Sequence, residues 1–170
     1  GLAIGTGIGG GIIVDGKLVS GKNGGGGEVG HIKVERNGKL CGCGQDGCWE
    51  AYASATGLIR EAQSRLAVNK TNKLYERVKG REIHHFLQYL FRSAKDIFDV
   101  AKEGDEFALK LVDYEAEYIA LGMGNLLNVL DPEIIVVVGG VALAGDILFN
   151  AINEKLKQYS LPSCLENLKI

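Results

Sequence analysis

The spacing of apolar residues changes along the chain and divides it into a glycine-rich first third and a largely helical remainder. Of the 25 glycines, 17 fall within the first 47 residues. Short apolar runs in this part predict three strands, over Leu2–Thr6, Gly10–Val14 and Lys17–Ser20. The dipeptide Asp15-Gly16 separates the last two runs and favours a two-residue hairpin, because both turn positions need positive φ angles.

Helical periodicity dominates after residue 47. Apolar residues recur there at three- and four-residue spacing, which is typical of helices with one buried face. The predicted helices cover Gly47–Ser54, Thr56–Leu66, Glu82–Phe91, Ser93–Gly104, Asp105–Leu130 and Asp146–Tyr159. We expect Asp105 to cap the longest helix and Asp131-Pro132 to end it. Residues 68–80 are polar and poorly patterned, so they predict a loop or a marginal helix.

A uniformly apolar run, Ile134–Val138, precedes the last predicted helix. All five of its residues are β-branched, and Gly139 and Gly140 follow directly. A strand with no polar alternation is expected to be buried on both faces of a helix-covered sheet. Hairpin strands, helices and this buried strand together predict an α/β layered domain.

Composition narrows the range of partners. The 170 residues are 46% hydrophobic and carry a formal net charge of −2, which argues against the basic surface of a nucleic-acid-binding domain. No apolar run approaches the roughly 20 residues that span a bilayer. We therefore expect a single soluble domain in the cytoplasm, with neither a nucleic acid nor a membrane as its partner.

A glycine-rich segment, Gly5-Thr6-Gly7-Ile8-Gly9-Gly10-Gly11, joins the first two predicted strands. Without Cβ atoms, backbone N–H groups can approach a phosphate closely, and Thr6 adds a hydroxyl donor. The spacing contains GxGxxG, but no helix follows, so the dinucleotide-binding interpretation fails. The Gly-Lys-Ser/Thr of a Walker loop is also absent. A glycine-rich hairpin without any ligand is the alternative.

Three cysteines, Cys41, Cys43 and Cys48, lie within eight residues of one another. His31 stands ten residues upstream and completes a Cys3His set, which is a closed structural zinc site with no open position for water. Cys164 is the alternative fourth ligand. A disulfide is disfavoured because a bridge between Cys41 and Cys43 would form a strained ring.

Two carboxylates lie close to these ligands in the sequence. Glu28 precedes His31 by three residues, and Glu50 follows Cys48 by two. Carboxylates and an imidazole N–H suit the hydroxyl groups of a sugar, so Glu28, His31 and Glu50 are candidate sugar-binding residues. The alternative for Glu50 is a helix N-terminal residue favoured by the helix dipole.

Three segments in this order resemble the ROK family of sugar kinases and sugar-responsive repressors. They are Leu2 to Gly11, Gly27-Glu28-Val29-Gly30-His31 and Cys41-x-Cys43-Gly-x-x-Gly47-Cys48-x-Glu50. The resemblance implies an actin-like, ribonuclease-H-like ATPase fold with a zinc-bound loop. Residues 1–170 would form the C-terminal, second lobe of a two-lobed enzyme whose N-terminal lobe and extreme C-terminus are absent.

The resemblance also assigns roles to particular residues. The second phosphate loop would comprise Gly5, Thr6, Gly7, Gly9, Gly10 and Gly11. Gly139 and Gly140 would lie near adenosine. The sugar-binding residues would be Glu28, His31 and Glu50, and the zinc ligands would be His31, Cys41, Cys43 and Cys48. No catalytic residue is assigned, because the family's aspartate base belongs to the absent N-terminal lobe.

The function implied by the resemblance is ATP-dependent phosphorylation of a hexose or N-acetylhexosamine, with glucose as the first choice. Magnesium would accompany ATP, the protein would form a homodimer, and this lobe alone would be inactive. The alternative is the effector-binding domain of a sugar-responsive repressor of the same family. A stand-alone zinc module would leave Glu28 and the glycine segment unexplained. His84-His85 is interpreted as a pair on a helix surface.

Overall fold

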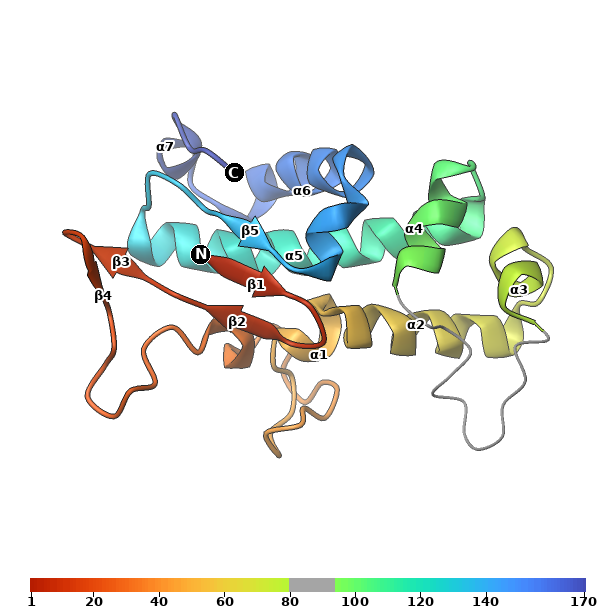
Figure 1. Ribbon diagram of the computed structural model, residues 1–170, viewed down its shortest axis with the longest axis horizontal. Coiled ribbons are helices and arrows are strands. Elements are labelled where there is room, and N and C mark those ends of the chain that lie inside the picture. The colour runs from red at the N-terminus through yellow and green to blue at the C-terminus, as the bar shows by residue number, and fades with distance from the viewer. Residues whose placement is uncertain (80–93) are drawn as a thin grey trace.

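The computed structural model describes residues 1–79 and 94–170, where a small mixed sheet lies against a layer of helices (Figure 1). The strands are β1 Leu2–Ile4, β2 Ile8–Gly10, β3 Ile13–Val14, β4 Lys17–Leu18 and β5 Val137–Val138. The helices are α1 Glu50–Ala53, α2 Ala55–Val68, α3 Lys73–Val78, α4 Lys95–Lys102, α5 Glu106–Leu130, α6 Asp146–Tyr159 and α7 Pro162–Leu165, with 3-10 turns η1 Val29–His31 and η3 Gly140–Ala144.

The main sheet has the strand order β2-β1-β5. Strand β2 runs antiparallel to β1 and pairs Leu2 with Gly10, whereas β5 runs parallel to β1 and pairs Leu2 with Val137. Because successive side chains point to opposite faces, Leu2 and Ile4 are buried while Ala3 between them is exposed. The sheet therefore packs its Leu2–Ile4 face into the core.

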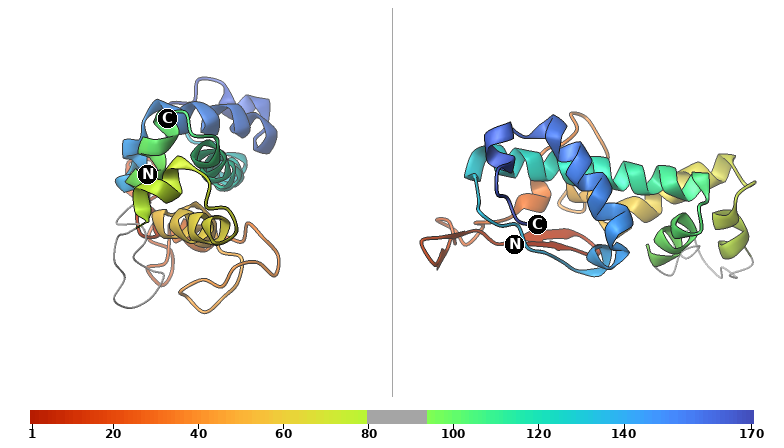
Figure 2. Two further views of the ribbon diagram at one scale, coloured as in Figure 1. Left: turned by 90° about the vertical axis from the view of Figure 1, so that its right-hand side faces the viewer. Right: turned by 90° about the horizontal axis from the view of Figure 1, so that it is seen from above.

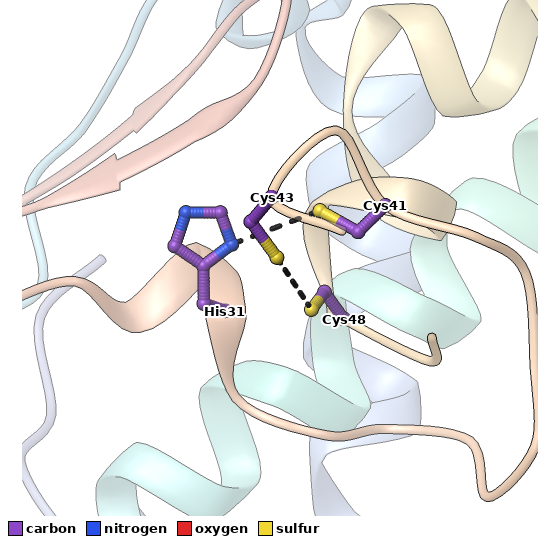
Figure 3. Close-up of side chains that lie close together, drawn as sticks. All are labelled: His31, Cys41, Cys43 and Cys48. Carbon is purple, nitrogen blue, oxygen red and sulfur yellow. Dashed lines mark hydrogen bonds between the residues drawn. The ribbon is translucent and has the colours of Figure 1, made fainter. Parts of the chain in front are cut away.

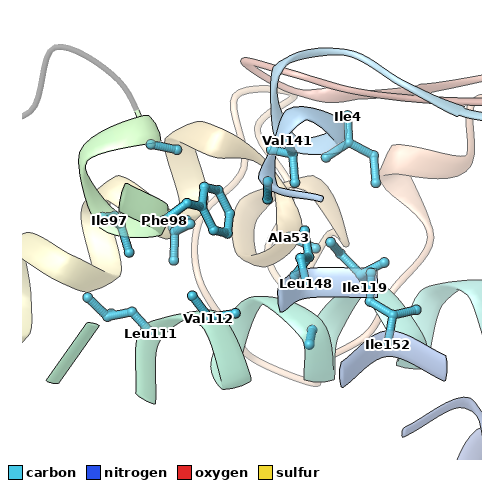
Figure 4. Close-up of a cluster of buried hydrophobic side chains, with 14 of the residues drawn as sticks. Ile4, Ala53, Ile97, Phe98, Leu111, Val112, Ile119, Val141, Leu148 and Ile152 are labelled. Atoms are coloured by element: carbon cyan, nitrogen blue, oxygen red, sulfur yellow. The ribbon is translucent and has the colours of Figure 1, made fainter. Parts of the chain in front are cut away.

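The long helix α5 forms the centre of the helical layer. It packs against α6, α4, α1 and α2, and two further views show α5 and α6 lying side by side (Figure 2). The Asp105 side chain accepts a hydrogen bond of 2.8 Å from the Ala108 N–H, so the predicted N-cap is confirmed. Asp131 adopts a left-handed conformation at the C-terminus of α5. Apolar side chains from β1, η3, α1, α4, α5 and α6 meet in one core (Figure 4).

The predicted hairpin around Asp15-Gly16 is confirmed. Both turn residues have positive φ angles, 50° and 73°, and β3 pairs with β4. The predicted strand Gly10–Val14 is wrong as one element, because β2 ends at Gly10 and β3 begins at Ile13. Gly11 donates its N–H to the Gly1 carbonyl, after which the chain leaves the main sheet for the β3–β4 hairpin.

The prediction that Ile134–Val138 is buried on both faces is wrong. The regular strand comprises only Val137–Val138, and Ile135 is 5% exposed whereas Val136 and Val138 are each 50% exposed. Burial therefore alternates along this segment. The physical reason is that, within the described ranges, the apolar layer lies against one face of the sheet, so every second β-branched side chain faces outward.

The remaining predicted helices have mixed outcomes. Helix α2 begins after Ser54, whose hydroxyl accepts from the Gly57 N–H, and α6 begins at Asp146 as expected. Residues 68–80 contain the short helix α3. The predicted helix Glu82–Phe91, the pair His84-His85 and the start at Ser93 lie outside the described residues. In the described part of the chain, no helix has both the length and the apolar character required to cross a bilayer.

Candidate functional site

The side chains of His31, Cys41, Cys43 and Cys48 converge on one point beside the sheet (Figure 3). Their potential ligand atoms all lie within 4.8 Å of one another. The Sγ atoms of Cys43 and Cys48 are 3.7 Å apart, and Cys41 Sγ is 3.7 Å from His31 Nδ1. The structure therefore brings the four predicted ligands together and leaves Cys164 outside the group.

These separations fit a tetrahedral metal ion. Metal–sulfur bonds of about 2.3 Å and metal–nitrogen bonds of about 2.0 Å place tetrahedral ligands about 3.5–3.8 Å apart. The two 3.7 Å separations match this spacing. Four protein ligands complete a tetrahedron, so the arrangement suits a structural ion rather than one that binds a reacting water.

Burial affects the protonation of the cluster. It raises the pKa of the Cys41 thiol to about 12, and it also raises the pKa of Cys48. The backbone N–H of Gln45 lowers the pKa of Cys43. The two buried thiols are therefore protonated at neutral pH without a cation, and a divalent ion that binds there must displace their protons.

Local backbone structure positions the four ligands. The turn η1 presents His31, and the Cys41 N–H donates to the Gln45 carbonyl at 2.7 Å, which closes a tight loop around Cys43. Lys33 and Cys48 form an isolated antiparallel bridge. Helix α1 begins two residues after Cys48, so the cluster is attached at its C-terminal end to the helical layer.

Glu50 connects the cluster to the β1–β2 hairpin. Its Oε1 lies 3.1 Å from Cys41 Sγ and 3.9 Å from His31 Nδ1, while its Oε2 accepts a hydrogen bond of 3.3 Å from the Ile8 N–H. A Cβ atom at Gly7 would stand 2.6 Å from the same Oε2. The absence of a side chain at Gly7 therefore permits this close approach.

The third candidate sugar-binding residue lies on the outer side of the histidine. Glu28 Oε2 is 3.9 Å from His31 Nε2, and the Glu28 side chain is 69% exposed. His31 thus directs Nδ1 toward the cysteines and Nε2 toward Glu28. Glu28, His31 and Glu50 are brought together, with one polar edge open to solvent.

The glycine segment forms a hairpin rather than one continuous loop. Gly5 donates to the Gly7 carbonyl at 3.0 Å in the turn, and Thr6 at the turn is exposed. Gly9 and Gly10 belong to strand β2, and Gly11 follows it. Residues 5–7 of this segment therefore form the turn between the two paired strands.

The second glycine segment lies at the same end of the sheet. Because β1 and β5 are parallel, the chain after each strand emerges at one edge, where Gly5 follows β1 and Gly139 follows β5. Gly139 packs against the backbone of Ile4, and Gly140 begins η3. The structure thus places both predicted nucleotide-binding segments side by side.

We expect Gly7→Ala to destabilise the protein by about 1 kcal/mol, the typical contribution of one hydrogen bond. The new methyl group would displace the Glu50 carboxylate and remove the acceptor of the Ile8 N–H. Urea unfolding measures the effect. Gly9→Ala is the matched control, because a Cβ there meets nothing within 4 Å, so its change should stay within about 0.5 kcal/mol. Equal losses in the two variants would contradict the role of Glu50.

Two residues near the site had no clear signal in the sequence. Lys39 is one polar residue in an irregular loop, yet its ammonium group contacts Tyr52, Glu61 and Tyr114. Glu115 is fully buried in α5. In the sequence, its burial was indicated by its position on the apolar stripe of the helix, four residues from both Leu111 and Ile119.

Comparisons with known proteins by sequence and by structure point to the same family. The profile of the ROK family matches residues 1–168. A glucokinase of Thermotoga maritima is 38% identical over 162 residues, covering 95% of this chain and 49% of that protein. A ROK family glucokinase from Streptomyces griseus, solved in complex with glucose and AMPPNP, has a TM-score of 0.84 at 30% identity, covering 99% of this chain and 53% of that chain.

A regulatory protein is similarly close in structure. A ROK family transcriptional regulator, a homolog of the E. coli MLC protein, has a TM-score of 0.81 at 31% identity, covering 99% of this chain and 39% of that chain. The chain spans about half the length of the curated relatives it matches. The expected mixed α/β, actin-like fold is confirmed by these likenesses.

Proposed function

This chain belongs to the ROK family, and from that premise we propose that its parent protein phosphorylates a hexose with ATP, with glucose as the first choice. The similarity to glucokinases supports the proposal. Residues 1–170 would supply the second lobe of the enzyme. The observation that carries the proposal is the position of Glu50, whose carboxylate contacts both the Ile8 N–H of the hairpin and the His31–cysteine cluster.

Phosphoryl transfer requires mainly that the reactants are positioned and that developing charge is stabilised. In the proposal, the amides and hydroxyl at Gly5, Thr6 and Gly7 bind the outer phosphates of ATP, together with Gly9, Gly10 and Gly11 behind the turn. Gly139 and Gly140, at the same end of the sheet, bind near adenosine. Mg²⁺ would accompany the nucleotide, since residues 1–79 and 94–170 contain no cluster of carboxylates that could hold it.

The sugar would bind on the other side of the hairpin. The carboxylates of Glu28 and Glu50 would accept hydrogen bonds from ring hydroxyls, and His31 Nε2–H would donate one. Together they would direct one hydroxyl toward the γ-phosphate. A zinc ion, when bound, supplies a fixed positive centre that holds the thiolates and keeps His31 neutral. The general base is an aspartate that we expect outside residues 1–170. A homodimer and a cytoplasmic location belong to the same proposal and rest on the family resemblance.

We expect the full-length parent to phosphorylate glucose with ATP at roughly 1–100 turnovers per second, as kinases typically do. N-acetylmannosamine and fructose should be poorer substrates, and the 170-residue chain alone should show negligible turnover, because the proposal places the base outside residues 1–170. A coupled assay of ADP formation over a hexose panel measures both. Turnover by the isolated chain would contradict the division between two lobes, and a parent inactive on every hexose would contradict the kinase.

The second candidate function is a sugar-sensing domain of a transcriptional repressor. The structural likeness to a ROK family transcriptional regulator favours it. The Gly5–Gly11 hairpin favours the kinase, because a repressor has no need to bind phosphates. The residues that precede Gly1 in the parent gene discriminate the two. A DxGxT strand and loop would indicate the kinase, and a basic helix-turn-helix would indicate the repressor.

A further inference from the structure

The ammonium group of Lys39 contacts side chains from three helices, and the Lys39 side chain is 36% exposed. Its Nζ donates hydrogen bonds of 2.7 Å to Glu61 Oε2 and 2.7 Å to the Tyr114 hydroxyl. It also lies 4.9 Å from the centre of the Tyr52 ring and 5.0 Å from that of Tyr114, within the range of a cation–π interaction. None of these groups belongs to the metal cluster or to the candidate sugar-binding set.

The backbone of Lys39 fixes the base of the cysteine loop. Its N–H donates a 2.5 Å hydrogen bond to the Tyr52 hydroxyl, and its carbonyl accepts one of 2.8 Å from the Gly47 N–H. Cys41 follows Lys39 by two residues, and Cys48 follows Gly47 directly. Both ends of the loop that carries the three thiols are therefore tied at Lys39.

The groups that contact Lys39 are themselves held in place by packed helices. Tyr52 lies on α1, Glu61 on α2 and Tyr114 on α5, so three packed helices contribute. The Tyr52 ring stacks on Tyr118 at 4.5 Å. Burial would raise the pKa of Glu61, but hydrogen bonds from Lys39 and Arg65 outweigh it and lower that pKa, so the carboxylate is charged at neutral pH. The contact to Lys39 is thus a partly exposed ion pair that lies beside two aromatic rings.

We propose that Lys39 is a positioning residue that sets Cys41 and Cys48 in place for the metal ion before the ion binds. Without such an anchor, the free energy of metal binding would have to offset the conformational entropy of ordering the loop. Partners beyond the ligands typically change metal affinity by about 10–100-fold. The inference rests on the metal site of the proposed function and is independent of the sugar or the nucleotide.

The test is a Co²⁺ and Zn²⁺ titration of the full-length protein in competition with a chromophoric chelator. We expect K39M to weaken both affinities by about 10–100-fold while the circular dichroism of the metal-free protein stays unchanged. K39R, which keeps the charge and the donors, should recover most of the affinity. K17M, at an exposed lysine of the β3–β4 hairpin, is the matched control and should stay within about twofold of wild type.

Three further outcomes decide the inference. Metal affinity of K39M within about twofold of wild type would overturn it. If K39M loses secondary structure, Y114F decides, because it removes only the hydroxyl acceptor: weaker metal binding supports the anchor, and unchanged binding overturns it. A wild-type protein that binds neither ion would overturn the metal site itself. The proposed sugar kinase activity is measured separately, so this result would not test it.

Discussion

Replacing Cys48 by serine is expected to abolish tight zinc binding and release the loop between Val34 and Gly47. The Cys48 side chain is fully buried, and its Sγ lies 3.7 Å from Cys43 Sγ. A serine hydroxyl stays protonated at neutral pH and is a poor zinc ligand, so the tetrahedral set would lose one corner. Structural zinc sites contribute apparent binding free energies of about 10–16 kcal/mol, which makes this the largest effect that we expect.

The measurement is zinc content after dialysis, combined with hydrogen exchange over the loop. Wild type should retain about one zinc ion per chain and C48S less than about a tenth of that. C164S is the matched control, since Cys164 packs half-buried against the main core and outside the cluster. It should keep full zinc content. Loss of zinc in C164S, or retention in C48S, would show that the ligand set differs from His31 and the three clustered cysteines.

Local signals in the sequence predicted much of the fold because they act over a few residues. The Asp105 cap, the Asp15-Gly16 turn and the Asp146 helix start each depend on neighbouring backbone groups, and each appears where expected. The Ile134–Val138 strand depended instead on what covers the sheet. An apolar run does not specify how many faces are packed, so the buried-on-both-faces prediction was wrong.

In the candidate site, too, the sequence predicted local features but not contacts that depend on packing. Close spacing along the chain predicted that His31 would join Cys41, Cys43 and Cys48, because glycines allow the loop to turn back on itself. The contacts of Glu50 with Ile8 and of Lys39 with Tyr114 join residues 42 and 75 positions apart. Such pairings depend on how the helices pack, and no local pattern reports them.

Glu115→Gln is expected to remove a pH-dependent loss of stability. The Glu115 side chain is fully buried, and within the described residues neither carboxyl oxygen has a hydrogen-bond partner. Burial raises the pKa of Glu115 well above its ordinary value, and the positive charge of Lys39 offsets only part of that rise. The folded state therefore keeps the proton at pH values where the unfolded chain has released it.

The sign of the effect follows from proton linkage. Below about pH 4.5 the carboxyl is protonated in both states, so it adds no penalty; above that pH the unfolded chain ionises while the folded chain does not. Wild-type stability should therefore fall by about 1.4 kcal/mol per pH unit until the pH reaches the folded-state pKa. Glutamine cannot ionise, so the free energy of unfolding of E115Q minus that of wild type should rise with pH over this window.

Guanidinium unfolding of both proteins between pH 5 and pH 8 measures this difference, and the titration of the metal ligands cancels because both proteins share it. E154Q is the matched control, since Glu154 on α6 is 75% exposed and its surface pair with Lys157 contributes little. Its difference from wild type should remain small at every pH. A flat or falling difference for E115Q would mean that Glu115 reaches solvent or a cation in the folded protein, and the burial of this carboxyl in α5 would then be wrong.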